Sequence, residues 1–200
     1  MDLALVALTF ASIFVVELPD KTFIATLVLS TRYRPWAVWV GVGLAFMVQT
    51  LIGVVAGQLA SALPATLVHS VALVIFLVGA VVLFRAAPTA DAEEGEQEQE
   101  YAAKARPVAT PVRAVGASFL VLFAAEWGDL SQLLTMTLVA KYHDPISVFV
   151  GAWTALLAVS GLAVLVGRWL INHVRLSLIH YVGAGVCLLL AALTAYEMLA

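Results

Sequence analysis

Two short acidic motifs contain the residues of this chain that could bind a metal ion. Each motif places two carboxylates and a hydroxyl inside sequence that is otherwise hydrophobic. An ionised group costs about 2.5–3.5 kcal/mol at the centre of a membrane helix, so four such groups indicate a function. The motifs read Glu17-Leu18-Pro19-Asp20-Lys21-Thr22 and Glu126-Trp127-Gly128-Asp129-Leu130-Ser131.

The spacing within each motif predicts a cluster of oxygen ligands. A glutamate and an aspartate three residues apart lie on one face of a helix, and the hydroxyl residue follows two positions later. Such ligands suit calcium, manganese or magnesium, and the lack of histidine and cysteine in the motifs argues against zinc or copper. We predict metal ligation by Glu17, Asp20, Thr22, Glu126, Asp129 and Ser131, with support from Lys21, Gln132, Gln49, Thr26 and Thr135.

Pro19 and Gly128 occupy the same position in the two motifs and predict a disturbed backbone there. Proline removes a helical hydrogen bond, and glycine loosens the helix. Freed backbone groups at membrane depth are tolerated where they face protein or a water-filled cavity. Both motifs are therefore expected to combine carboxylates, a hydroxyl and a perturbed backbone at corresponding depths.

The charge of this cluster predicts competition between protons and metal ions. Like charges and desolvation both disfavour the ionised form, so four clustered carboxylates cannot all stay ionised in an empty site. Some would hold protons until a cation displaces them, which is a mechanism for proton–cation exchange. Lys21 would act as an internal counter-ion that moves between Asp20 and water as the occupancy changes.

The composition predicts an integral membrane protein built of helices. Hydrophobic residues make up 63% of the 200 residues, charged residues make up 12%, and the mean hydropathy is +1.03. A soluble domain of this size needs more charge to cover its surface. The single cysteine, Cys187, cannot form an intrachain disulfide. Turn signals separate six apolar spans at roughly Leu3–Ser30, Trp36–Ala60, Thr66–Phe84, Arg113–Ala140, Ile146–Leu170 and Leu176–Leu199.

A polar segment divides the six spans into two groups of three. Residues 86–112 contain an acidic run from Asp91 to Glu100, bracketed by prolines. This composition cannot bury a core and predicts disorder. The predicted domains are a first three-helix repeat at residues 1–85, an acidic disordered cytoplasmic linker at residues 86–112, and a second three-helix repeat at residues 113–200.

The two halves match one another in sequence. The first motif aligns with the second at an offset of 109 residues, as do Thr26 with Thr135 and Tyr33 with Tyr142. Three helices per copy mean that the second copy enters the membrane from the opposite face. The predicted fold class is therefore all-α integral membrane, with six transmembrane helices as two inverted three-helix repeats and the substrate near the midplane.

The positive charges predict how the chain crosses the membrane. One side of the six spans holds eight lysines and arginines, and the other side holds Lys141 alone, so both termini should be extracytoplasmic. The N-terminal apolar run has no basic residue before it and no small-residue cleavage site after it, so we expect a retained helix and not a signal peptide. The eight are Arg32, Arg34, Arg85, Lys104, Arg106, Arg113, Arg168 and Arg175.

At these motifs the chain resembles the Golgi-type calcium/manganese–proton antiporter family, whose bacterial members include manganese exporters. That family has two copies of Glu-x-Gly-Asp, each followed by a basic and a hydroxyl residue, in inverted three-helix repeats. The resemblance covers essentially the whole chain, with two departures: Pro19 replaces the first glycine, and Leu130 replaces the second basic residue. Because the chain lacks the organelle-targeting presequence of eukaryotic relatives, a bacterial inner membrane is the expected location.

Three functions are open from the sequence. The leading one is a transporter, not an enzyme, that exports Mn²⁺ and/or Ca²⁺ from the cytoplasm in exchange for protons. The second is an exporter of another small cation such as a basic amino acid. The third is an intramembrane aspartyl protease that uses Asp20 and Asp129, although the glutamates and the repeat have no role in proteolysis. The expected partners are the cation, protons and the lipid bilayer, without a resident cofactor or nucleic acid; the oligomeric state stays open.

Overall fold

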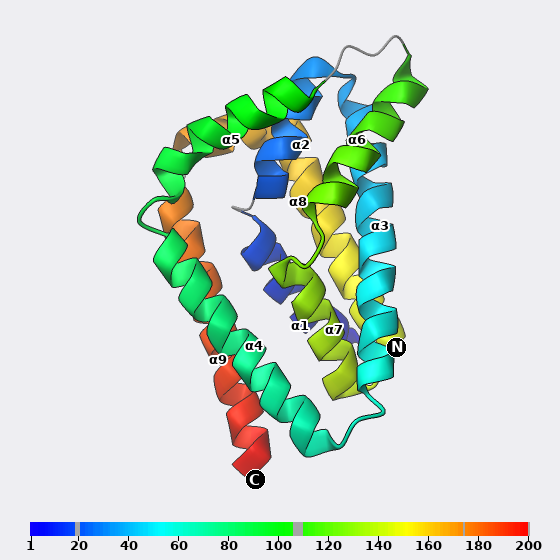
Figure 1. The fold of residues 1–200 in the computed structure, drawn as a ribbon, viewed down its shortest axis with the longest axis vertical. Helices are drawn as coiled ribbons and strands as arrows, with labels where there is room; N and C mark the ends of the chain where they lie inside the picture. The colour runs from blue at the N-terminus through cyan, green and yellow to red at the C-terminus, as the bar shows by residue number, and fades with distance from the viewer. Residues whose placement is uncertain (19–20, 106–109, 174, 200) are drawn as a thin grey trace.

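The computed structural model of the protein is a bundle of α-helices (Figure 1). The structure describes residues 1–18, 21–105, 110–173 and 175–199, and these residues form nine helices and no strands. The helices are α1 (Leu3–Glu17), α2 (Lys21–Arg32), α3 (Pro35–Ala60), α4 (Ala65–Ala86), α5 (Ala90–Lys104), α6 (Pro111–Ala125), α7 (Leu130–Tyr142), α8 (Pro145–His173) and α9 (Leu176–Leu199).

Four helices are long and apolar enough to cross a membrane, and two bent pairs could each supply one more span. The four are α3, α4, α8 and α9. The α1–α2 pair bends by 71° and the α6–α7 pair by 72°. The described chain thus has four to six candidate spans. The first and fourth predicted spans are each two helices, not one, because the backbone changes direction at the acidic motifs.

The bent pairs pack against the long helices in a crossed pattern. Helices α1 and α2 lie against α8, whereas α6 and α7 lie against α3. Gly41 of α3 allows the close approach of α6, since a Cβ atom there would lie 2.4 Å from the Val115 carbonyl oxygen. Gly151 of α8 does the same for α1, where a Cβ would lie 2.6 Å from the Val6 carbonyl oxygen. Each bent pair is therefore held by a long helix from the other half of the sequence.

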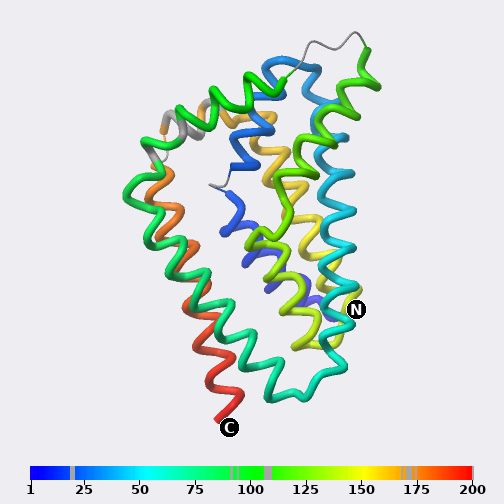
Figure 2. The backbone as a smooth tube through the Cα atoms, viewed as in Figure 1, coloured from blue at the N-terminus to red at the C-terminus, as the bar shows by residue number. Residues whose placement is uncertain are grey.

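Helices α4 and α9 run side by side along one flank of the bundle (Figure 2). A buried lysine links this flank to α7. The Nζ atom of Lys141 lies 3.0 Å from Thr194 Oγ1 and 3.0 Å from Glu197 Oε2, both on α9. The Lys141 side chain is only 2% exposed, so these two partners compensate a charge that would otherwise be costly to bury.

The acidic segment forms helix α5 where the sequence predicted a disordered linker. Helix α5 crosses one end of the bundle and contacts α2 and α9 (Figure 1). Tyr101 of α5 is buried in the core, and Lys104 pairs with Glu100 one turn earlier. The prediction of disorder rested on low hydrophobicity and overlooked that alanine, glutamate, glutamine and lysine are strong helix formers. Residues 106–109 of the predicted linker lie outside the described residues.

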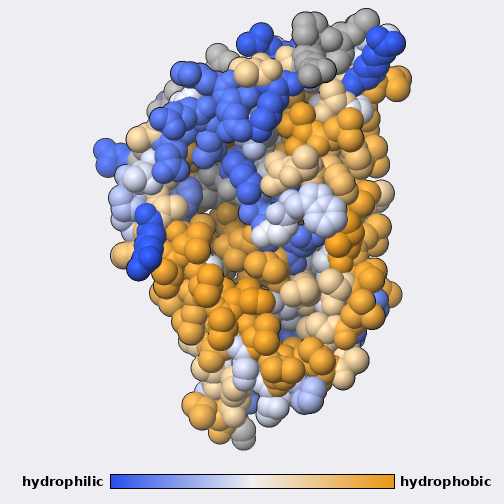
Figure 3. All heavy atoms as spheres, viewed as in Figure 1, coloured by the Kyte–Doolittle hydropathy of each residue, from blue (hydrophilic) through white to orange (hydrophobic). Residues whose placement is uncertain are grey.

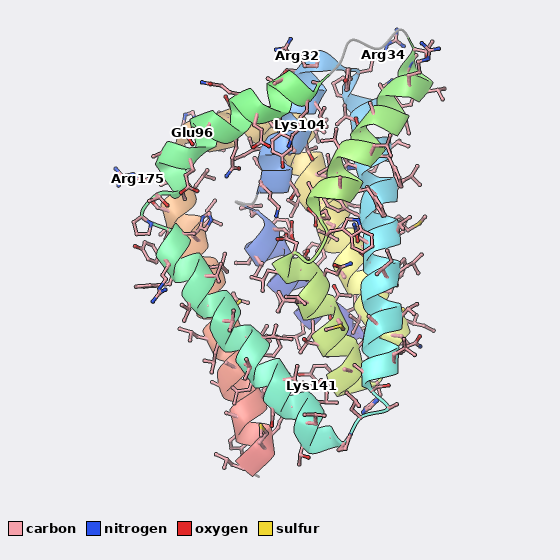
Figure 4. The ribbon with its side chains drawn as sticks, in the orientation of Figure 1. Arg32, Arg34, Glu96, Lys104, Lys141 and Arg175 are labelled. Atoms are coloured by element: carbon pink, nitrogen blue, oxygen red, sulfur yellow. The ribbon has the colours of Figure 1, made fainter. Side chains whose placement is uncertain are left out.

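Polar and apolar surfaces separate along the long axis of the molecule. Hydrophilic side chains gather over the end that carries α5, and apolar side chains cover most of the body below it (Figure 3). Arg32, Arg34, Lys104 and Arg175 lie near the α5 end, whereas Lys141 lies toward the opposite end (Figure 4). Both chain termini lie in the half of the molecule away from α5 (Figure 1).

Candidate metal centre

The two bends bring three carboxylates together. Glu17 is the last residue of α1, Glu126 directly follows α6, and Asp129 directly precedes α7. One carboxylate oxygen from each of these residues lies within 4.8 Å of the other two. Glu17 is 1% exposed and Glu126 is 2% exposed. The candidate centre therefore joins residues from both halves of the sequence at the ends of half-helices.

One part of the geometry expected from the sequence is wrong. The spacing predicted Glu126 and Asp129 on one face of a continuous helix, but α6 ends at Ala125 and α7 begins at Leu130. Gly128 lies between the helices with φ of +73°, in the left-handed region that favours glycine. The second pair of acids thus converges because the helix stops. Asp20, the remaining predicted carboxylate, lies outside the described residues.

The hydroxyls of both motifs reach the same carboxylate. Thr22 Oγ1 donates a hydrogen bond to Glu17 Oε2 at 3.2 Å, and the Ser131 side chain also lies close to Glu17. Thr26 and Thr135 lie one turn further along α2 and α7. Their hydroxyls donate to the backbone oxygens of Thr22 and Ser131, at 2.7 and 2.8 Å. These two threonines therefore brace their own helices one layer away from the carboxylates.

Lys21 supplies a positive charge to the centre. Its Nζ atom lies 3.3 Å from Asp129 Oδ1, so an ion pair joins the first residue of α2 to the second motif. The Lys21 side chain is 38% exposed, and that of Asp129 is 16% exposed. The sequence led us to expect Asp20 as the partner of Lys21, within one motif. The described contact crosses between the two halves of the chain, and the expected contact with Asp20 falls outside the described residues.

Glu17 Oε1 and Asp129 Oδ2 are buried oxygens of the centre that take no hydrogen bond from a donor among the described residues. Leaving a buried polar atom without a partner costs about 1–3 kcal/mol, and such atoms are rare in native proteins. A cation or a proton would supply the missing partner, so this donor set fits a metal ion.

Two glutamines hold the second bend through a chain of hydrogen bonds. Gln49 Nε2 of α3 donates to the Phe123 carbonyl at 2.8 Å, and Gln132 Nε2 of α7 donates to Gln49 Oε1 at 2.9 Å. The Gly128 N–H donates to Gln132 Oε1 at 3.0 Å. The two amides therefore pair with backbone groups at the end of α6, where an interrupted helix leaves such groups without helical partners.

Sequence reasoning missed this role of the glutamines. It placed Gln49 and Gln132 near the ion as extra oxygen ligands, because both are polar residues in apolar spans. Their bonds to the backbone depend on where α3 passes the bend, and no spacing in the sequence reveals that. A small cavity of about 10 Å³, the size of one water molecule or bare ion, is lined by both glutamines together with Glu126, Ser131 and Thr135.

Comparison with known proteins identifies the family. The family described as "Divalent cation/proton antiporter GDT1" matches residues 5–91 and 114–200. The protein belongs to the GDT1 family. This is a family of membrane transporters and not of enzymes, as the sequence motifs had predicted. The two matched segments begin 109 residues apart, which is also the offset between the two acidic motifs.

Several curated proteins resemble this GDT1 chain along most of its length. The PAM71-homolog of Arabidopsis thaliana, a chloroplast protein, is 30% identical over 92% of this chain and 57% of its own. A GDT1-like protein of Synechocystis is 38% identical over 64% of this chain and 66% of its own. A proposed manganese exporter of Vibrio cholerae is 30% identical over 97% of this chain and 92% of its own.

The chain spans little more than half the length of the chloroplast relatives that it matches, 57% and 56% for the two from Arabidopsis thaliana. No solved structure matches the chain. The GDT1 assignment therefore rests on sequence similarity, and the geometry of the centre comes from this structure.

Proposed function

We propose that this GDT1 protein is a secondary transporter that exports divalent cations, manganese and/or calcium, from the cytoplasm in exchange for protons. The observation that carries the proposal is the meeting of Glu17, Glu126 and Asp129 from two bent helix pairs. Ionisable groups inside membrane segments mark ion pathways. Helices interrupted near the midplane are where secondary transporters place their substrates and coupling ions. Family membership supports the class of reaction.

The ligand chemistry favours a hard divalent cation as the substrate. The three clustered side chains are carboxylates, with hydroxyls from Thr22 and Ser131 beside them. Calcium and manganese prefer such oxygen ligands. The adjoining cavity of about 10 Å³ is far smaller than an amino-acid side chain. The structure therefore favours a bare metal ion over the basic amino acid that the sequence had left open.

Proton coupling follows from the competition for the same oxygens. Glu17 Oε1 and Asp129 Oδ2 are buried and take no hydrogen bond from the described residues. Each oxygen can be completed by a proton or by the metal ion, and the two occupants exclude one another. A transporter that alternates between the two occupants exchanges cations for protons. This alternation is the proposed mechanism of antiport.

Several contacts support two inverted three-helix repeats. The bends of 71° and 72° are nearly equal. The contact of Gly41 with Val115 has a counterpart in the contact of Gly151 with Val6, at the position expected from the repeat alignment. The two segments that match the family also share the 109-residue offset. In this arrangement α1–α2, α3 and α4 form one repeat, and α6–α7, α8 and α9 form the other.

The charges support an orientation with α5 on the cytoplasmic side. Arg32, Arg34, Lys104 and Arg175 lie near the α5 end, and Lys141 lies toward the other (Figure 4). Positive charges concentrate on the cytoplasmic side of membrane proteins, so both termini would be extracytoplasmic. A bacterial inner membrane is the proposed location, and the similarity to a Vibrio cholerae protein is consistent with it.

Metal flux into proteoliposomes tests this proposal. Manganese, calcium and magnesium would be offered separately, with a pH gradient imposed in either direction. We expect flux of manganese or calcium that reverses with the gradient and falls to the level of protein-free liposomes in Glu17→Gln and Glu126→Gln. Glu100→Gln is the matched control, because this carboxylate lies on the exposed face of α5 and pairs with Lys104.

Two results would overturn the proposal. The first is the absence of gradient-dependent flux for every divalent ion in the wild-type protein. The second is flux in Glu17→Gln and Glu126→Gln that equals flux in Glu100→Gln. Transport of lysine or arginine in place of metals would restore the alternative of an organic-cation exporter.

A further inference from the structure

Lys21 lies at the boundary between the carboxylate cluster and a cavity on the α5 side. It is the first residue of α2, and its Nζ atom is 3.3 Å from Asp129 Oδ1. The cavity has a volume of about 400 Å³ and is lined by Lys21, by Tyr101 and Lys104 of α5, and by residues of α6. A flexible side chain of four methylenes can therefore place its ammonium at the cluster or in the cavity.

The two motifs differ at the position of Lys21. Its counterpart in the second motif, 109 residues later, is Leu130. The Leu130 side chain packs against α4, where one of its methyl carbons lies 3.0 Å from the point that a Cβ on Gly79 would occupy. In the second motif this position therefore serves helix packing. The internal cation that the described centre contacts comes from the first motif.

We infer that the Lys21 ammonium is a resident cation, which occupies the centre when no metal ion is bound and moves into the α5-side cavity when one binds. This inference rests on the proposed function. Asp129 Oδ1, which Lys21 contacts, belongs to the carboxylate that a metal ion would share with Glu17 and Glu126. A divalent ion at those oxygens and an ammonium 3.3 Å from one of them repel each other strongly. Binding of the ion thus requires Lys21 to leave.

This displacement sets both the affinity and the rate of release. While Lys21 pairs with Asp129, an incoming ion must break that pair, which weakens binding. On release, the returning ammonium replaces the ion and keeps the buried carboxylates from being left uncompensated. A transporter needs binding that is strong enough to capture the ion and weak enough to release it. Lys21 would set that balance in this chain.

Removal of the charge tests the inference. Wild type, Lys21→Met and Lys21→Arg would be compared in manganese/manganese exchange in proteoliposomes, with equal pH on both sides so that no proton gradient drives transport. We expect Lys21→Met to lower the half-saturating manganese concentration roughly tenfold, as for the loss of a like charge at short range, and to lower the maximal rate. Lys21→Arg keeps the charge and should stay near wild type.

Lys104→Met is the matched control. Lys104 lines the same cavity, but its ammonium pairs with Glu100 on α5 and not with the carboxylate cluster. We expect its half-saturating concentration to change much less than that of Lys21→Met. Lys21→Gln provides a second neutral variant if Lys21→Met does not yield folded protein. Equilibrium titration of the purified variants with manganese should show the same order of affinities as the exchange assay.

The inference is overturned if Lys21→Met and Lys21→Gln bind manganese as weakly as wild type or more weakly, or if Lys104→Met shows the same gain as Lys21→Met. The proposed transport function would still stand in that case, provided that the wild type shows flux and Glu17→Gln abolishes it. Absence of exchange in the wild type with manganese and also with calcium would instead remove the proposed function on which the inference rests.

Discussion

The two bends at the candidate centre have the same angle but different internal support. At the second bend, Gln49 and Gln132 hydrogen-bond to each other and to the backbone around Gly128. In the repeat alignment their counterparts at the first bend are Val159 and Phe23. Both side chains are 1% exposed and pack together in a hydrophobic cluster. One bend is thus supported by amide hydrogen bonds, and the other is packed with apolar side chains.

This difference shows that two bends of nearly equal angle, 71° and 72°, can have different internal support. Apolar packing is non-directional and tolerates small shifts, whereas a chain of hydrogen bonds fixes the distances between particular atoms. Among the described residues, hydrogen bonds therefore fix particular atoms at the second motif, whereas apolar packing holds Phe23 beside the first. The first motif carries the partly exposed Lys21, whose side chain is long. Three substitutions outside the cluster of Glu17, Glu126 and Asp129 can break or sharpen this comparison.

The largest effect is expected from copying the proline of the first motif into the second. In Gly128→Pro the ring would fix φ near −65°, against the observed +73°, and would remove the N–H that donates to Gln132. We expect a loss of about 3 kcal/mol or more in the free energy of unfolding, measured in detergent solution. Gly128→Ala retains the N–H and should lose only about 1–2 kcal/mol. Equal stability of Gly128→Pro and wild type would mean that the two bends are interchangeable.

An intermediate effect is expected from breaking the amide chain. Gln132→Leu leaves the Gly128 N–H without its acceptor and Gln49 Oε1 without its donor, and each unsatisfied group costs about 1–3 kcal/mol. We also expect weaker manganese binding in a titration, because Glu126 and Asp129 flank the loosened segment. Phe23→Leu is the control at the first bend. It removes apolar contacts and leaves no polar group unsatisfied, so manganese affinity should stay near wild type; equal weakening in both variants would contradict the comparison.

The smallest effect is expected at the turns that follow the bent pairs. Asp144 caps α8 by accepting hydrogen bonds from the Ser147 hydroxyl and, at 3.1 Å, from the Ser147 N–H, whereas Arg34 at the start of α3 makes no side-chain cap. The hydrogen bond from the Ser147 hydroxyl, and to a smaller extent that from the Ser147 N–H, lowers the pKa of the Asp144 carboxyl from its usual value. Because this pKa is lower in the folded state than in the unfolded state, the ionised carboxylate stabilises the fold at pH values above the unfolded-state pKa. This stabilisation is lost as the pH falls through the folded-state pKa.

Asp144→Ala should therefore lower the Tm by a few degrees at neutral pH, and its difference from wild type should shrink in acid. Thermal unfolding of both proteins across a range of pH measures this difference. Arg34→Ala is the control at the corresponding turn and should show no such dependence on pH. A constant difference between Asp144→Ala and wild type at all pH values would mean that the carboxylate charge contributes nothing to the cap.

Much of the molecule follows from residue types and their order. Long apolar runs predict membrane helices because lipid cannot satisfy backbone polar groups, and the structure has four to six candidate spans. The paired acidic motifs predicted the antiporter family, which the comparisons confirm. The acidic segment was predicted wrongly, since its low hydrophobicity concealed the helix propensity that forms α5.

The arrangement of the candidate centre depended on tertiary structure. Sequence alone identified Glu17, Glu126 and Asp129 as candidates, but it placed Glu126 and Asp129 on one continuous helix face. The structure brings them together at half-helix ends, pairs Lys21 with the aspartate of the other motif, and uses two glutamines to support the bend. These contacts join residues about 80 to 110 positions apart, 83 for Gln49 with Gln132 and 108 for Lys21 with Asp129. Local periodicity reports the conformation of one segment and its apolar face, whereas the packing of distant helices decides which polar groups meet.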